Sequence, residues 1–306
     1  MTSSQTPKRR IILHLGAPKT GTTSLQYYLS ENREVLESAG VVYPERMIQG
    51  GQVDPLHTHL VQMRTRRNPE VAFDGARARL AALFEASGAH SLLLSNESLL
   101  GEPYHEDKPG FFPHHEKWIG ELARLFDGYE VQVIYFIRNF ATFLPSYYVQ
   151  YVRKGGTKTL REFCDHVTED DLSWCPLIKG LQIAFGPDNV RIFEHAALRE
   201  HPAQEVRDVF GRYAPELPDF CASSYNQNPS VGNNILAVYR LLNRIFAVLV
   251  PSARKRHLRP KMRQYLFGPL ALISGNRRPR LEADLASKLR EIYARDRKAL
   301  GLENQR

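Results

Sequence analysis

The chain has 306 residues, of which 42% are hydrophobic, so it is long enough to bury a sizeable core and has the composition of neither a disordered nor a collagen-like protein. Its formal net charge of +8 favours anionic partners such as nucleotides, acidic glycans, nucleic acid or a membrane surface, without selecting among them. The three cysteines are widely spaced and form no C-x-x-C pair, which excludes a disulfide framework and a zinc cluster. The sequence shows neither a signal-peptide pattern nor an apolar run of membrane length, so a cytoplasmic protein is expected.

The first predicted element is a short strand over residues 10–15, followed by a helix that begins at Thr22 and ends near Gly40. A second short strand is expected at 41–43, and residues 45–72 are polar and irregular. Further along, we expect an amphipathic helix over 74–88 with Asp74 as its cap, a buried strand over 91–95 and a surface loop over 101–115.

In the second half of the chain, a helix is expected around 115–127 and the strongest strand over 130–137. A helix follows within 142–156, another strand over 189–195, and the remainder reads as mostly helical. Strands that alternate with helices predict an α/β fold with a doubly wound, mostly parallel sheet. A single domain over 1–306 is expected, with a motif-bearing core at about 10–215 and a helical C-terminal part at about 216–306.

The segment HLGAPKTGTTSLQYYL, residues 14–29, places a glycine-containing turn between the first strand and the first helix. Such a turn is an anion site, because backbone N–H groups point into it and the helix dipole adds positive charge. Gly16 and Gly21 have the spacing of a Walker phosphate loop, but Thr22 stands where the Walker lysine belongs. The lysine is Lys19 instead, and hydroxyls come from Thr22, Thr23 and Ser24.

A second candidate anion site follows the 130–137 strand. Arg138 stands at the carboxyl end of this strand, where open α/β sheets bind their ligands, and Ser146 follows eight residues later on the next helix. A guanidinium fork and a hydroxyl that converge would bind a phosphate. Alternatively, Arg138 caps a helix and Ser146 faces solvent.

Together, the two motifs resemble those of the sulfotransferases that use 3′-phosphoadenosine 5′-phosphosulfate. The residues of the first motif are most similar to those of the bacterial branch of that family. The resemblance implies a phosphate-loop fold, a sulfuryl donor, adenosine 3′,5′-bisphosphate as product and no required metal. It covers roughly residues 10–215. It implies a 3′-phosphate site at Arg138 and Ser146, and a 5′-phosphosulfate loop made of Lys19, Thr20, Gly21, Thr22, Thr23 and Ser24.

The chain departs from the family pattern at three places. Phe140 stands where members often have proline, and Phe193 where relatives often have a tyrosine near the nucleotide. No glycine-rich C-terminal lid is evident; residues 230–234, SVGNN, are the candidate for it.

The catalytic base is expected to be a histidine or glutamate, as in relatives. Glu97, two residues after the 91–95 strand, is the first choice, with an N-cap or first-turn role as the alternative. Of the pair His57 and His59, His59 is the favoured alternative base, and Glu45 is a further candidate. His14, on the first strand, is interpreted as a packed core residue.

Three function classes remain open on these residues. The leading hypothesis is sulfuryl transfer to a hydroxyl or amine of a carbohydrate, lipid or small molecule. A phosphate-loop kinase or NTPase is the alternative, and Thr22 in the lysine position disfavours it. A non-catalytic binding module is the third, although no nucleic-acid reader motif is present. In residues 244–274 a cluster of basic residues is flanked on both sides by apolar runs. This pattern suggests either peripheral membrane contact or a core helix followed by a solvated basic turn.

Overall fold

The computed structural model describes residues 8–46, 53–65, 68–105, 108–165, 171–225, 233–249 and 279–303. The chain divides into two compact units. The first consists of Met1–His105, Phe112–Arg138 and Trp174–Asn226, and the second of Glu106–Phe111, Asn139–Ser173 and Gln227–Arg306. The single domain expected from the sequence stays a prediction.

The first unit is built on a five-stranded sheet in which every pairing is parallel, with the strand order β2-β3-β1-β4-β5. The strands are β1 (Arg10–Gly16), β2 (Val41–Val42), β3 (Ser91–Ser95), β4 (Glu130–Ile137) and β5 (Val190–Glu194). In the register of the central strands, His14 of β1 lies between Ser95 of β3 and Ile134 of β4. The doubly wound parallel sheet predicted from the sequence is therefore confirmed.

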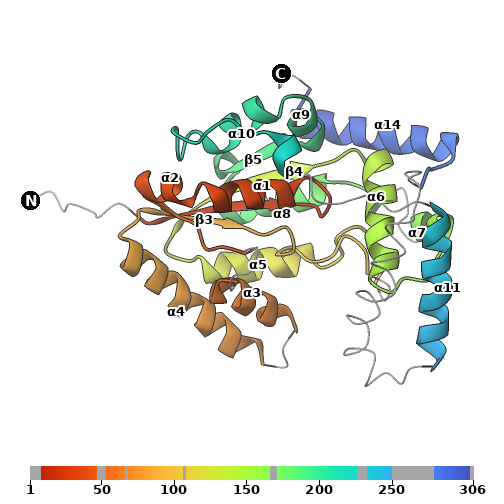
Figure 1. Ribbon diagram of the computed structural model, residues 1–306, viewed down its shortest axis with the longest axis horizontal. Coiled ribbons are helices and arrows are strands. Elements are labelled where there is room, and N and C mark those ends of the chain that lie inside the picture. Colours follow the sequence, from red (N-terminus) through yellow and green to blue (C-terminus); the bar gives the residue numbers. More distant parts are fainter. Residues whose placement is uncertain are drawn as a thin grey trace, which may run out of the picture. The chain divides into compact units, whose positions relative to one another are not determined.

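Helices cover both faces of this sheet (Figure 1). On one face lie α1 (Thr22–Glu31), α2 (Arg33–Ser38), α9 (His195–Glu200) and α10 (Pro202–Phe210). On the other lie α3 (Pro55–Thr65), α4 (Pro69–Ser87), α5 (His115–Leu125) and α8 (Cys175–Phe185). On the first face, Leu25 and Leu29 of α1 and Phe210 of α10 pack with Ile12 and Phe136 of the sheet in one buried cluster. This packing fixes the position of α1, the helix that directly follows the loop after β1.

Three predictions differ from the structure. The helix expected from Thr22 to near Gly40 is two helices, α1 and α2, separated at Asn32. The segment 45–72, expected to be irregular, contains α3, because Asp54 accepts a hydrogen bond from the backbone N–H of Leu56 at 2.8 Å and Pro55 takes the first helical position. Helix α4 begins at Pro69 and not at Asp74, since a proline is well suited to the first turn of a helix.

The second unit is helical, as expected for the C-terminal part. Its main helices are α6 (Phe140–Arg153), α7 (Leu160–Asp165), α11 (Asn233–Leu249) and α14 (Ala283–Ala299). Asn139 caps α6 by accepting a hydrogen bond from the backbone N–H of Ala141 at 3.0 Å. The buried Asn243 of α11 donates to the carbonyls of Val152 and Gly156, both at 2.8 Å, and so fastens α11 to the end of α6.

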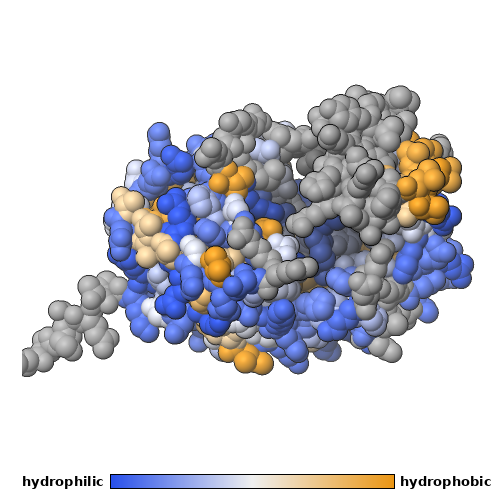
Figure 2. All heavy atoms as spheres, turned by 90° about the horizontal axis from the view of Figure 1, so that it is seen from below, coloured by the Kyte–Doolittle hydropathy of each residue, from blue (hydrophilic) through white to orange (hydrophobic). Residues whose placement is uncertain are grey.

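The outer face of α11 is apolar. Its exposed side chains are between 44% and 83% accessible and lie at the right in Figure 2: Val238, Leu241, Ile245, Val248 and Leu249. Of the basic segment 244–274, only residues 244–249 belong to α11, and 250–274 lie outside the described residues. Residues 230–232 of the candidate lid lie outside them as well. In the part of the chain that the structure describes, no helix is long and apolar enough to cross a bilayer.

Candidate functional site

The loop between β1 and α1 has a conformation that few residues adopt. Lys19 has a φ of 72° and Gly21 a φ of 84°, so both lie in the left-handed region, which is costly for a lysine. The fully buried hydroxyl of Thr20 donates to the carbonyl of Ala17 at 2.6 Å and closes the turn from inside. The hydroxyl of Thr20 therefore stabilises the shape of the loop. For binding an anion, Thr20 can offer its backbone N–H and not its hydroxyl.

The loop ends in a helix N-terminus that presents hydrogen-bond donors. Gly21 occupies the N-cap of α1 without a side-chain cap, and the first turn contains no acidic residue. The backbone N–H groups of Thr22 and Thr23 donate to no described residue, whereas that of Ser24 bonds to Gly21 at 3.1 Å. Donors in this arrangement favour an anion, and the exposed side chain of Lys19 adds a full positive charge.

Gly21 also allows the close approach of α9. A Cβ at this position would lie 3.1 Å from the Cδ2 atom of Leu198, so any larger residue would press on α9 as well as strain the backbone. Glycine at position 21 therefore allows both the left-handed turn and the close packing of this turn against α9.

Arg138 lies against the same loop. It directly follows β4, and its Nη1 atom donates a hydrogen bond to the carbonyl of Lys19. The indole N–H of Trp174 donates to the carbonyl of Arg138 at 3.1 Å and holds the backbone there. The structure therefore brings together the phosphate loop and the arginine of the second motif. Ser146, the other member of that motif, lies half-buried on α6 of the second unit.

A histidine that was not among the predicted site residues lies beside this loop. His195 is the first residue of α9 and lies close to Gly21, where a Cβ would be 3.9 Å from the histidine ring. Burial, together with the positive charges of Arg138 and Arg199, lowers the pKa of His195 to about 3. The imidazole is therefore neutral in a positively charged neighbourhood. Its place directly after β5, at the carboxyl edge of the sheet, is the sequence signal that could have found it.

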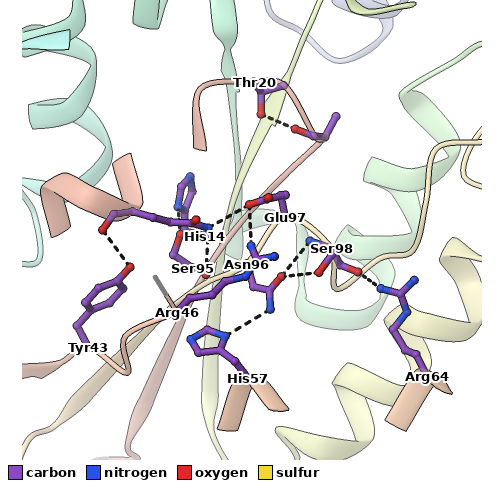
Figure 3. Close-up of polar contacts among 12 residues, drawn as sticks. His14, Thr20, Tyr43, Arg46, His57, Arg64, Ser95, Asn96, Glu97 and Ser98 are labelled. Atoms are coloured by element: carbon purple, nitrogen blue, oxygen red, sulfur yellow. Dashed lines mark hydrogen bonds and ion pairs between the residues drawn. The ribbon is translucent and has the colours of Figure 1, made fainter. Parts of the chain in front are cut away.

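Glu97 lies two residues beyond the end of β3, and β3 is the strand that pairs with β1. Its Oε2 atom accepts hydrogen bonds from Gln26 at 3.0 Å and from Arg46 at 2.8 Å (Figure 3). Gln26 is one helical turn after Thr22, so the carboxylate is tied to the start of the helix that follows the phosphate loop. Oε1 accepts a hydrogen bond from none of the described residues, and the side chain is 20% exposed. Among the described residues, the carboxylate of Glu97 therefore has one oxygen without a donor, and it lies at the same edge of the sheet as the loop.

Asn96 and His57 form a polar link just below Glu97 (Figure 3). The side-chain oxygen of Asn96 accepts from the backbone N–H and the hydroxyl of Ser98, at 3.0 and 2.8 Å, and this shapes the turn after β3. The imidazole of His57 bonds to the carbonyl of Pro44 at 2.9 Å and to the amide of Asn96 at 3.4 Å. Burial lowers the pKa of His57, and both ring nitrogens are occupied, so His57 is a structural residue.

The other candidate bases lie elsewhere in the first unit. His59, on α3, packs so tightly over Gly75 of α4 that a Cβ there would be 2.5 Å from the ring. It lines a shallow pocket of about 380 Å³ with Val53, Pro55, Thr58, Gln62 and Val71. Glu45 accepts hydrogen bonds from Ser30 at 3.1 Å and Arg33 at 3.3 Å. No contact among the described residues joins His59 or Glu45 to Glu97 or to the loop.

His14 is a fully buried histidine on the strand that leads into the loop. Its Nδ1 atom is hydrogen-bonded to the hydroxyl of Ser95 at 2.7 Å, and its ring meets Phe136 and Phe210 edge-on. Its Nε2 atom has no partner among the described residues. Burial lowers the pKa of His14 to about 4, and the charge of Glu97 opposes this shift. The interpretation as a packed core residue agrees with these contacts.

We expect His14 to make the protein less stable in mild acid. Between pH 6.5 and 4 the unfolded chain binds a proton at this imidazole and the folded chain does not, so the free energy of unfolding falls as the pH falls. The contribution of His14 is a loss of about 2 kcal/mol from pH 7 to pH 5. Urea unfolding at several pH values should show this slope in wild type and a flatter slope in His14→Phe, which keeps an aromatic ring. Equal slopes would show that His14 does not titrate in this range.

Comparisons with known proteins give structural similarity only. No protein-family description matches the sequence, and no curated protein matches it significantly. Among solved structures, the chain is similar to a sulfotransferase from Alicyclobacillus acidocaldarius, with 17% identity, a TM-score of 0.43, and coverage of 80% of this chain and 98% of that one.

Two further solved structures are similar to a comparable extent. For the sulfotransferase domain from the curacin biosynthetic pathway, the identity is 13%, the TM-score 0.42 and the coverage 76% of this chain and 83% of that one. For the sulfotransferase domain from the Synechococcus PCC 7002 olefin synthase, the identity is 12%, the TM-score 0.41 and the coverage 86% of this chain and 97% of that one. All three belong to the class that the two sequence motifs resemble.

Proposed function

We propose that this protein is a sulfotransferase that moves a sulfuryl group from 3′-phosphoadenosine 5′-phosphosulfate to a hydroxyl or amine acceptor. The observation that supports this most strongly is that three groups follow neighbouring parallel strands at the same edge of the sheet. These are the Lys19 loop, the guanidinium of Arg138 bonded to that loop, and the carboxylate of Glu97 tied to α1. An anion cradle beside a carboxylate suits a reaction in which an anionic group moves and a proton must be removed.

The donor's 5′-phosphosulfate would be held by the loop. Backbone N–H groups from Thr20 to Thr23 and the hydroxyls of Thr23 and Ser24 are the donors, and Lys19 supplies the charge. Arg138 would bind the 3′-phosphate. Ser146 is assigned to that phosphate by its spacing from Arg138 in the sequence, and its participation stays a prediction. Lys19 supplies the positive charge of the proposed site, and the resemblance to the sulfotransferases implies that no metal is required.

The transfer is an in-line displacement at sulfur, in which positioning and charge stabilisation do most of the catalysis. The acceptor oxygen or nitrogen forms a bond to sulfur while its proton passes to Oε1 of Glu97. The bond between sulfur and the bridging oxygen breaks, and its electron pair stays on that oxygen, next to the ammonium group of Lys19. The products are the sulfated acceptor and adenosine 3′,5′-bisphosphate, and Glu97 returns its proton to water.

We assign the base to Glu97 rather than to His59. Glu97 is joined to α1 through Gln26, and its Oε1 atom accepts from none of the described residues, whereas His59 is packed against Gly75 in the pocket between α3 and α4. The acceptor is a carbohydrate, a lipid or another small molecule that carries a hydroxyl or amine group.

The test is transfer of radiolabelled sulfate from the phosphosulfate donor to a panel of sugar, lipid and phenolic acceptors in the presence of EDTA. We expect labelled product with wild type, independent of magnesium. Magnesium-dependent turnover of ATP without any sulfate transfer would favour the kinase or NTPase alternative and overturn the proposal.

A further inference from the structure

Arg46 is the second partner of the proposed base. Its Nη1 atom lies 2.8 Å from Oε2 of Glu97, and the two side chains are 23% and 20% exposed. The same oxygen accepts from Gln26 at 3.0 Å, so both contacts fall on one side of the carboxylate. Ion pairs that are largely shielded from water restrict the side chains that form them more than exposed pairs do.

The backbone that carries Arg46 is itself fastened to the site. Arg46 follows the end of β2 and stands two residues after Pro44, whose carbonyl bonds to His57, which in turn bonds to Asn96 beside Glu97. On the other side, the hydroxyl of Tyr43 donates to the carbonyl of Gln26 at 3.4 Å. The segment after β2 is therefore tied both to the turn after β3 and to α1, and these ties bring Arg46 to Glu97.

We propose that Arg46 is a positioning residue for sulfuryl transfer: it holds Oε2 of Glu97 by an ion pair and leaves Oε1 to take the acceptor proton. This role rests on the proposed function. A carboxylate held by two donors on one oxygen keeps one rotamer, and a base that is misplaced by about 1 Å can lose about 10²-fold in rate. Arg46 touches neither the donor loop nor Arg138 by any contact among the described residues, so its effect should fall on the rate and not on donor binding.

The experiment compares Arg46→Gln and Arg46→Lys with wild type and with Arg77→Gln, a control at an exposed position on α4. We expect Arg46→Gln to lower kcat by about 10- to 100-fold, with donor KM and the Kd of adenosine 3′,5′-bisphosphate within about twofold of wild type. Arg46→Lys should restore most of the lost rate, because it keeps a cation that can reach the carboxylate.

A double-mutant cycle separates positioning from a general structural effect. In the Glu97→Gln background, Arg46→Gln should cause no further loss, since the group it positions is already disabled. A wild-type rate in Arg46→Gln, failure of Arg46→Lys to rescue, or equal losses in both backgrounds would overturn the role of Arg46. If wild type binds no bisphosphate and transfers no sulfate, the proposed function itself fails, and the role of Arg46 fails with it.

Discussion

Replacing Glu97 by glutamine is expected to lower kcat by about 10²- to 10⁴-fold, the range that removal of a general base usually costs. Glutamine has nearly the same shape and can still accept hydrogen bonds from Gln26 and Arg46, but it cannot take a proton from the acceptor. The measurement is the initial rate of sulfate transfer at saturating donor. Donor affinity should change little, because Glu97 bonds to Gln26 of α1 and contacts no loop residue among those that the structure describes.

Two matched variants give this prediction its controls. Glu85→Gln removes an exposed carboxylate from α4 and should keep the wild-type rate. His59→Asn tests the competing base, and we expect it to retain most of the activity. If His59→Asn loses the rate and Glu97→Gln keeps it, the assignment of the base to Glu97 is wrong.

Replacing Lys19 by methionine should lower kcat/KM for the donor by about 10²- to 10³-fold, since it removes the charge next to the oxygen on which negative charge develops. Methionine is unbranched and of similar length, and it has a Cβ as lysine does. The strain of the left-handed backbone, with its φ of 72°, is therefore the same in both. Lys19→Gly provides the complementary case, because glycine adopts this backbone without strain. Both variants should lose activity to the same degree if the charge is what matters.

Removal of a surface charge elsewhere is the control for the net charge of the protein. Lys179 lies exposed on α8, and Lys179→Met should leave kcat/KM unchanged at physiological ionic strength. An active Lys19→Met, or an active Lys19→Gly beside an inactive Lys19→Met, would show that the loop's conformation and not its charge governs the reaction.

The sequence was most informative where chemistry is local. A strand, a turn with glycines and the start of a helix follow one another within residues 10–31, as the sequence predicted, and the binding of an anion by this loop stays a prediction. The ends of buried strands are also predictable: Arg138 and Glu97 follow β4 and β3 as expected, at the edge of a parallel sheet, and their functional roles stay predictions.

The rest depends on contacts between distant residues. Arg46 meets Glu97 across 51 positions of the chain, and no local pattern around Arg46 marks it, because it stands in a polar segment that was expected to be irregular. The same segment concealed α3, whose start depends on a single side-chain cap from Asp54. His57 and His59 could be told apart only once α3 was seen to be a helix, since residues two apart point in different directions on a helix.

The most direct test of the central claim is calorimetric titration of adenosine 3′,5′-bisphosphate, without magnesium, into wild type, Arg138→Ala and the exposed control Arg77→Ala. We predict tight binding by wild type and by Arg77→Ala, and about 10- to 100-fold weaker binding by Arg138→Ala, because charge-assisted hydrogen bonds to a phosphate are lost. A folded wild-type protein that ignores the bisphosphate and binds ATP with magnesium would contradict the proposed donor site.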